Sequence, residues 1–230
     1  MIGFYNYTEL LTYLSLISAS TGIALSFMGQ GHPFIGMICL LFCAFCDSFD
    51  GKVARLKKDR TDIECKFGIQ IDSLSDVIAF GVLPASIGMS LLFKSEYMYA
   101  AGGKWYQLVF TVAGFAIMAF FVLAALIRLA YFNVTEEERQ KTESGPRKYY
   151  VGLPVTLSAI IMPIPFAVQM IVGALANVDI TYVYFIVMLG VAFAFISKFH
   201  LKKPDLKMLV GMVIFGSVEL AALILAFVLQ

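Results

Sequence analysis

Four aspartates at the ends of two apolar segments are the strongest chemical feature of this sequence. Asp47 and Asp50 are three residues apart, and Asp72 and Asp76 are four residues apart. On helices, each spacing places both side chains on one face, so two facing helices would direct all four carboxylates to a common point. Unpaired negative charges cannot share a dry site, and one or two divalent cations are the simplest way to neutralise them.

The residues that follow the first aspartate pair suit a phosphate-bearing ligand. Gly51 lets a ligand approach the backbone closely, and Arg55, with Lys52 on the same helical side, offers positive charge for phosphate oxygens. Metal ions held by aspartates suit displacement at phosphorus, so the pattern indicates transfer of a phosphoryl-containing group. Two alternatives stay open. The acids could be solvated or paired with neighbouring lysines and arginines, or they could line an ion pathway, although such pathways usually place carboxylates near the middle of the membrane.

The elements that carry these residues are predicted to be membrane-spanning helices. Of the 230 residues, 60% are hydrophobic and only 14% are charged, and the mean hydropathy is +0.84. Soluble domains do not carry so much apolar sequence, and several stretches approach the roughly 20 residues that a spanning helix needs. We therefore expect an all-α, polytopic transmembrane helix bundle of six to seven spans, forming a single integral-membrane domain over residues 1–230. The expected spans are residues 10–28, 33–50, 68–93, 105–132, 152–175, 180–196 and 209–229.

The distribution of positive charge predicts the orientation of these spans. Fourteen of the seventeen lysines and arginines fall in the loops after the second, fourth and sixth spans, whereas Lys94 and Lys104 lie on the other side. By the positive-inside rule, the three basic loops are cytoplasmic, and the aspartate site faces the cytoplasm. The formal net charge of +1 gives no indication of a nucleic-acid partner.

Three further segments are interpreted as structural rather than functional. Cys39, Cys43 and Cys46 recur at helical spacing, which favours soft packing residues over metal ligands. The hydroxyl-rich first span is predicted to pack closely against a neighbouring helix. The segment before that span is expected at the membrane interface, with Tyr5 and Tyr7 as anchors.

The aspartate segment resembles the CDP-alcohol phosphatidyltransferase family. That family carries the pattern Asp-x-x-Asp-Gly-x-x-Ala-Arg, a spacer, and Gly-x-x-x-Asp-x-x-x-Asp. This chain matches every fixed position of it, namely Asp47, Asp50, Gly51, Ala54, Arg55, Gly68, Asp72 and Asp76. Twelve residues separate Arg55 from Gly68, four more than the usual spacing of the family. The charges of this longer spacer, including Lys57 and Glu64, are expected to form a solvated face.

Within the family, the sequence is most similar to the membrane-embedded enzymes that use serine as the acceptor. The resemblance rests on the run from Asp72 to Asp76, on Phe80–Ala85, on Arg128–Val134 and on Gly152–Pro154. Tyr131 departs from the pattern, because these relatives more often carry arginine at its position.

The resemblance implies a reaction and a set of site residues. It implies two divalent ions, Mg²⁺ or Mn²⁺, held by Asp47, Asp50, Asp72 and Asp76, with Asp76 also the general base. It implies CDP-diacylglycerol as the donor in a pocket shaped by Gly51, Ala54, Arg55 and Gly68, L-serine as the acceptor, CMP as the leaving group, surrounding membrane lipids and a homodimer. Glycerol 3-phosphate or an inositol phosphate is the alternative acceptor. A divalent-ion transporter or a structural membrane protein is the alternative class.

Arg128 and Asn133 are the candidate serine-binding residues. Arg128 is the basic residue that falls within a predicted span, and its planar guanidinium suits a carboxylate. Asn133 follows five residues later and could hydrogen-bond the same ligand or cap the helix. Alternatively, Arg128 extends its charge to the membrane surface, or it pairs with Glu136 or with a lipid phosphate. If so, Arg147 and Lys148 are the next candidates for the serine carboxylate.

Overall fold

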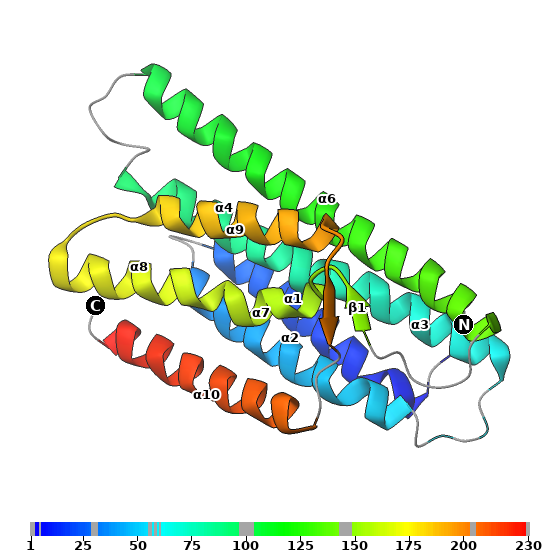
Figure 1. Cartoon of the computed structure of the whole chain (residues 1–230). Coiled ribbons are helices and arrows are strands. Elements are labelled where there is room, and N and C mark those ends of the chain that lie inside the picture. Colours follow the sequence, from blue (N-terminus) through cyan, green and yellow to red (C-terminus); the bar gives the residue numbers. More distant parts are fainter. Residues whose placement is uncertain are drawn as a thin grey trace.

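The computed structural model describes residues 3–4, 6–28, 32–54, 57, 59, 61–96, 104–142, 149–202 and 206–228, without the side chains of residues 52, 54, 206–210 and 213. Helices make up most of this part of the chain, which confirms the expected all-α class. The helices lie alongside one another in a bundle, with α6 along one edge and α10 along the opposite edge (Figure 1). In chain order they are η1 (Tyr7–Glu9), α1 (Leu10–Phe27), α2 (Pro33–Ala54), α3 (Asp62–Asp76), η2 (Val77–Val82), α4 (Leu83–Lys94), α6 (Lys104–Thr142), η3 (Val155–Leu157), α7 (Ser158–Ile161), α8 (Pro163–Ala176), α9 (Thr181–Ile196) and α10 (Leu206–Val228).

Five of the described helical segments are long and apolar enough to cross a membrane. They are Tyr7–Phe27, Pro33–Gly51, Asp62–Lys94, Lys104–Thr142 and Val155–Ala176. Two shorter apolar helices, Thr181–Ile196 and Ile214–Val228, fall where the sixth and seventh spans are expected. The chain is therefore an integral membrane protein.

Two predicted loops are partly helical. A capping box explains the difference in the first loop, and an ion pair within the helix explains it in the second. The helix of the third span begins at Asp62 rather than at Gly68, because Thr61 and Glu64 form a reciprocal capping box at its start. The fourth helix continues ten residues past Phe132, to Thr142. Arg139 contacts Glu136 at 2.6 Å within this extension, and such pairs one turn apart support a solvated helix.

Helices α1 and α2 pack closely, as the small residues of the first span predict. A Cβ atom placed on Gly22 would lie 2.8 Å from the Cβ of Cys39, so only glycine fits at this crossing. The thiol of Cys43 donates to the carbonyl oxygen of Ser15 at 3.2 Å. The packing interpretation of the cysteines is confirmed for Cys43, and α2 is held firmly where it carries the first aspartate pair.

A wide helical turn directly follows Asp76, and Pro84 explains it. Proline has no N–H to offer the carbonyl of Phe80, four residues earlier. The helix therefore widens to a π turn over Val77–Val82, in which the Leu83 N–H reaches back to Ile78. The Ser158 hydroxyl donates to the Phe80 carbonyl at 2.9 Å and satisfies it from α7. Turns of this kind often occur at functional sites, and this one joins the second aspartate pair to the buried helix α4.

Two short strands interrupt the helical pattern near the end of α9. Strand β1 (Tyr149–Val151) pairs antiparallel with β2 (His200–Lys202). Gly152 follows β1 with φ +74°, and a Cβ there would lie 2.9 Å from the Phe195 carbonyl oxygen. Glycine is required both by the left-handed conformation and by this close approach. The pairing holds the segment that leads into η3 against the end of α9.

Candidate metal centre

The ends of α2 and α3 bring three of the four predicted aspartates together. Asp47 and Asp50 lie on α2, and Asp72 lies on α3. Each offers a carboxylate oxygen, and these oxygens all lie within 4.8 Å of one another. Among the described residues, this is the one group of acidic, histidine or cysteine side chains that lie close enough together to share a metal ion. Three hard oxygen donors so close together fit Mg²⁺ or a similar divalent cation, because without a cation their charges repel.

Asp76 lies next to this group rather than within it. It interacts electrostatically with Asp47, Asp50 and Asp72, and it is half-buried. The position is one helical turn from Asp72 on the same face of α3, which is the placement that the i,i+4 spacing predicts.

A cavity of about 300 Å³ opens beside Asp50 and Asp72. Gly51 and Gly68 line it as predicted, and they leave room for a ligand because they carry no side chain. The remaining lining residues are Thr8, Glu9, Thr12, Cys65 and Ile69. Ala54 ends α2 and its side chain lies outside the described part of the structure, as does the whole of Arg55.

Thr8 and Glu9, which line this cavity from the turn before the first span, were not predicted from the sequence. Both are only 3% exposed. Burial of a glutamate just before an apolar helix is costly unless the group has partners or a ligand, so an acid at this position was the available signal. The segment was interpreted as an interfacial anchor instead, and Tyr7 is indeed 56% exposed on the other side of the same turn.

A second, apolar cavity of about 350 Å³ lies between α2, the η3–α7 segment and α10. Asp47 and Ser48 stand at its polar end, and side chains such as Phe42, Ile160 and Leu220 make up the rest. The aspartate group therefore borders two cavities. Asp50 and Asp72 line the first cavity, and Asp47 lines the second. The first is called the polar cavity because most of its lining residues are acidic or carry a hydroxyl group, and the second is called the apolar cavity.

Arg128 and Asn133 both lie on α6. The side chain of Asn133 donates to the hydroxyl of Ser73 at 2.8 Å, which ties α6 to the residue after Asp72. Arg128 is 5% exposed, so its charge does not extend to the surface. Its Nε donates to the Leu153 carbonyl oxygen at 3.1 Å, and its guanidinium lies 5.2 Å from the ring centre of Phe132. The predicted next candidates, Arg147 and Lys148, lie outside the described residues.

The chain is similar to known proteins over most of its length. A family profile described as CDP-alcohol phosphatidyltransferase matches residues 5–196. The chain is 32% identical over 188 residues to a Helicobacter pylori protein named CDP-diacylglycerol–serine O-phosphatidyltransferase, which covers 79% of this chain and 69% of the relative. A Saccharomyces cerevisiae protein of the same name is 38% identical over 145 residues, or 62% of this chain and 44% of the relative. An archaetidylserine synthase from Methanothermobacter thermautotrophicus is 35% identical over 150 residues, or 64% and 53% of the two chains.

Proposed function

The chain belongs to the CDP-alcohol phosphatidyltransferase family, and from this premise we propose that it transfers the phosphatidyl group of CDP-diacylglycerol to the hydroxyl of L-serine, releasing CMP. The observation that carries the proposal is the position of the three aspartates between a polar and an apolar cavity. CDP-diacylglycerol has the same order of parts, with a nucleotide, two phosphates and two acyl chains. The names of the relatives from Helicobacter pylori and Saccharomyces cerevisiae support serine as the acceptor.

The substrate is proposed to lie across the aspartate group. Its nucleotide half occupies the cavity lined by Gly51 and Gly68, with Ala54 and Arg55 close by in sequence. Its acyl chains occupy the apolar cavity, which a lipid could enter from the bilayer. The scissile bond, between the phosphatidyl phosphorus and the CMP oxygen, then lies at the carboxylates.

The proposed metal ligands are Asp47, Asp50 and Asp72, completed by Asp76. Mg²⁺ or Mn²⁺ bound there would offset the negative charge that the diphosphate accumulates as CMP leaves. Two ions are proposed from the family resemblance and the number of carboxylates. The protein's own contribution is to hold these oxygens within 4.8 Å of one another on α2 and α3, which both pack against α1.

Asp76 is proposed to act as the general base. The serine hydroxyl oxygen forms the new bond to phosphorus, its proton passes to the Asp76 carboxylate, and the bond to CMP breaks. Arg128 is proposed to bind the serine carboxylate, oriented by its hydrogen bond to Leu153, and Asn133 is proposed to contribute to the same subsite from five residues further along α6.

The active site is proposed to face the cytoplasm. The support is the excess of basic residues at this end of the chain's helices, including Lys57 near α3 and Arg139 near the end of α6. A cysteine introduced at Glu138, in a variant without reactive native thiols, should react with a membrane-impermeant maleimide only after the cytoplasmic face is opened. Reaction in sealed cells would reverse the orientation. A homodimer is proposed on the family resemblance, and the mass of the protein in detergent would test it.

Release of CMP tests the function directly. The purified protein should release CMP from CDP-diacylglycerol when L-serine and Mg²⁺ or Mn²⁺ are present, and form a lipid that contains serine. Glycerol 3-phosphate and inositol phosphate should each support at most a few per cent of that rate. Release with one of those acceptors instead would keep the chemistry and change the acceptor, whereas metal binding or transport without CMP release would contradict the proposed enzyme.

A further inference from the structure

We propose that Glu64 is a positioning residue. It holds in place the N-terminal wall of the polar cavity, formed by Thr8 and Glu9, and so sets the affinity for the nucleotide half of the substrate. The inference rests on the proposed function for the identity of that ligand. It also assigns a role to the long spacer between Arg55 and Gly68, whose charges were expected only to be solvated. That expectation is wrong for Glu64, whose side chain is 15% exposed and engaged on both oxygens.

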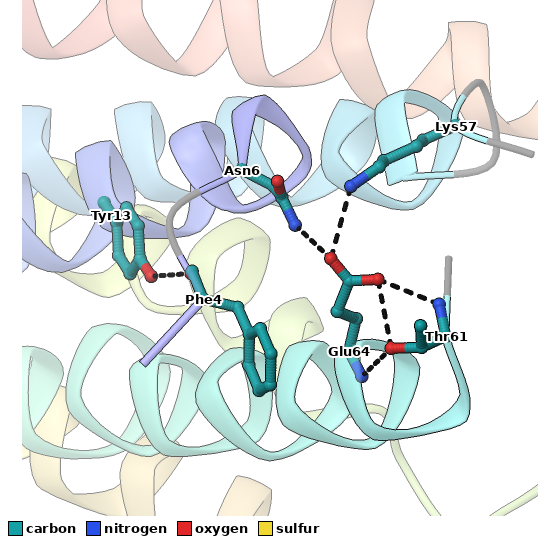
Figure 2. Close-up of polar contacts among 6 residues, drawn as sticks. All are labelled: Phe4, Asn6, Tyr13, Lys57, Thr61 and Glu64. Atoms are coloured by element: carbon teal, nitrogen blue, oxygen red, sulfur yellow. Dashed lines mark hydrogen bonds and ion pairs between the residues drawn. The ribbon is translucent and has the colours of Figure 1, made fainter. Parts of the chain in front are cut away.

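Glu64 connects three separate stretches of the chain (Figure 2). Its Oε1 accepts hydrogen bonds from Asn6 Nδ2 at 2.8 Å and from Lys57 Nζ at 3.3 Å. Its Oε2 accepts from the Thr61 backbone N–H at 2.8 Å and from the Thr61 hydroxyl at 3.1 Å. One carboxylate thus joins the N-terminal segment, the spacer and the first turn of α3, and charge-assisted bonds of this kind are stronger than neutral ones.

The N-terminal segment makes two further contacts in the same place. The ring of Phe4 meets that of Phe67 edge-on, with their centres 5.5 Å apart. The hydroxyl of Tyr13 donates to the Phe4 carbonyl oxygen at 3.4 Å, so the segment is held against both α1 and α3 (Figure 2). Both contacts hold Phe4, two residues before Asn6.

The residues that follow Asn6 form the wall of the polar cavity. Thr8 and Glu9, two and three positions further on, both line it. A displacement of Asn6 therefore moves Thr8 and Glu9 relative to Gly68 and Asp72 on the opposite side. A carboxylate such as that of Glu9 is suited to accept a hydrogen bond from the exocyclic amine of cytosine, so the wall has a chemical means of recognising the nucleotide.

A simple structural role for Glu64 makes a different prediction. With Thr61 it forms the capping box of α3, and loss of a capping box destabilises the start of a helix. The two roles use different partners, because Thr61 belongs to the cap and Asn6 to the contact with the cavity wall. Substitution of each partner separately distinguishes them, and Thr61→Ala is the matched control for Asn6→Ala.

The test measures turnover and nucleotide binding in detergent micelles. Asn6→Ala should raise KM for CDP-diacylglycerol and Kd for CMP by about tenfold, the effect of one lost hydrogen bond to a charged group. It should leave kcat and KM for serine within about twofold of the wild type. Thr61→Ala should lower the unfolding temperature without changing KM. The double variant Asn6→Asp with Glu64→Gln, which exchanges donor and acceptor, should recover most of the affinity.

The outcomes separate this inference from the proposed function. Unchanged KM and Kd in Asn6→Ala would overturn the positioning role, as would an equal rise in both quantities in Thr61→Ala. If the wild type binds CMP but forms no serine lipid, the proposed acceptor fails. A weaker affinity for CMP in Asn6→Ala would still support the contact between Asn6 and Glu64 as the support of the cavity wall.

Discussion

Asp50→Asn is expected to reduce CMP release by roughly 100-fold or more, since even substitutions behind the direct ligands of a metal typically cost 10–100-fold. Asp50 is one of three aspartates whose oxygens lie within 4.8 Å, and it borders the polar cavity as well. Asparagine offers a neutral carbonyl oxygen in place of a charged carboxylate, so the variant would have one negative charge fewer to hold a hard cation. The steady-state rate with saturating serine and CDP-diacylglycerol is the measurement.

Metal removal should reproduce this loss in the wild type. EDTA is expected to abolish turnover, and an excess of Mg²⁺ or Mn²⁺ should restore it. Asp59→Asn removes the same charge from an exposed residue of the spacer and serves as the matched control, with activity near that of the wild type. The fold should survive Asp50→Asn, because the change relieves repulsion among close carboxylates. Full activity of a folded Asp50→Asn protein would contradict the proposed metal site.

Arg128→Lys is expected to raise KM for serine by at least tenfold while KM for CDP-diacylglycerol changes little. Arg128 is buried, and its Nε donates to the Leu153 carbonyl. A lysine ammonium is a point charge that cannot keep this bond and also present two parallel N–H groups to a carboxylate. The loss of one charge-assisted hydrogen bond corresponds to a factor of about ten or more in affinity.

The control for Arg128→Lys is the same substitution at Arg139. Arg139 lies on the same helix and contacts Glu136 in the part of α6 beyond the apolar span, so Arg139→Lys should leave both KM values unchanged. Comparison of the two variants separates serine recognition from a general effect of lysine on α6. A folded Arg128→Lys protein with an unchanged KM for serine would place the carboxylate subsite elsewhere, with Arg147 and Lys148 as the next positions to test.

The aspartate site is the part of this protein that could be predicted most completely from the sequence. Helical spacing alone places Asp47 with Asp50 and Asp72 with Asp76, because the period of the α-helix fixes which side chains share a face. The apolar runs on either side identify membrane spans, since the hydrocarbon core sets the number of residues required. Together these rules predicted two helices that present carboxylates to each other. The structure places three of the four carboxylates in one group, with Asp76 beside it.

The positions of helix ends were harder to predict from the sequence, because particular side-chain contacts set them and the periodicity of apolar residues does not. The early start of α3 depends on a reciprocal pair of hydrogen bonds between Thr61 and Glu64. The π turn after Asp76 depends on the missing N–H of Pro84. It also depends on the hydroxyl of Ser158, which donates to the carbonyl of Phe80, 78 positions earlier in the chain. Apolar patterning carries no information about such partners.

Only the tertiary structure determined what surrounds the aspartates. Thr8 and Glu9 line the polar cavity, and Asn6, just before them, donates to Glu64, which lies 58 residues further along the chain. Arg128 receives its partner because Gly152, with φ +74°, brings the Leu153 carbonyl to α6. The sequence by itself thus determined the residues that could hold a metal and the helices that carry them, since both follow from short-range periodicity. The walls of the cavities and the orientation of Arg128 depend on contacts between distant segments, which only the packed bundle decides.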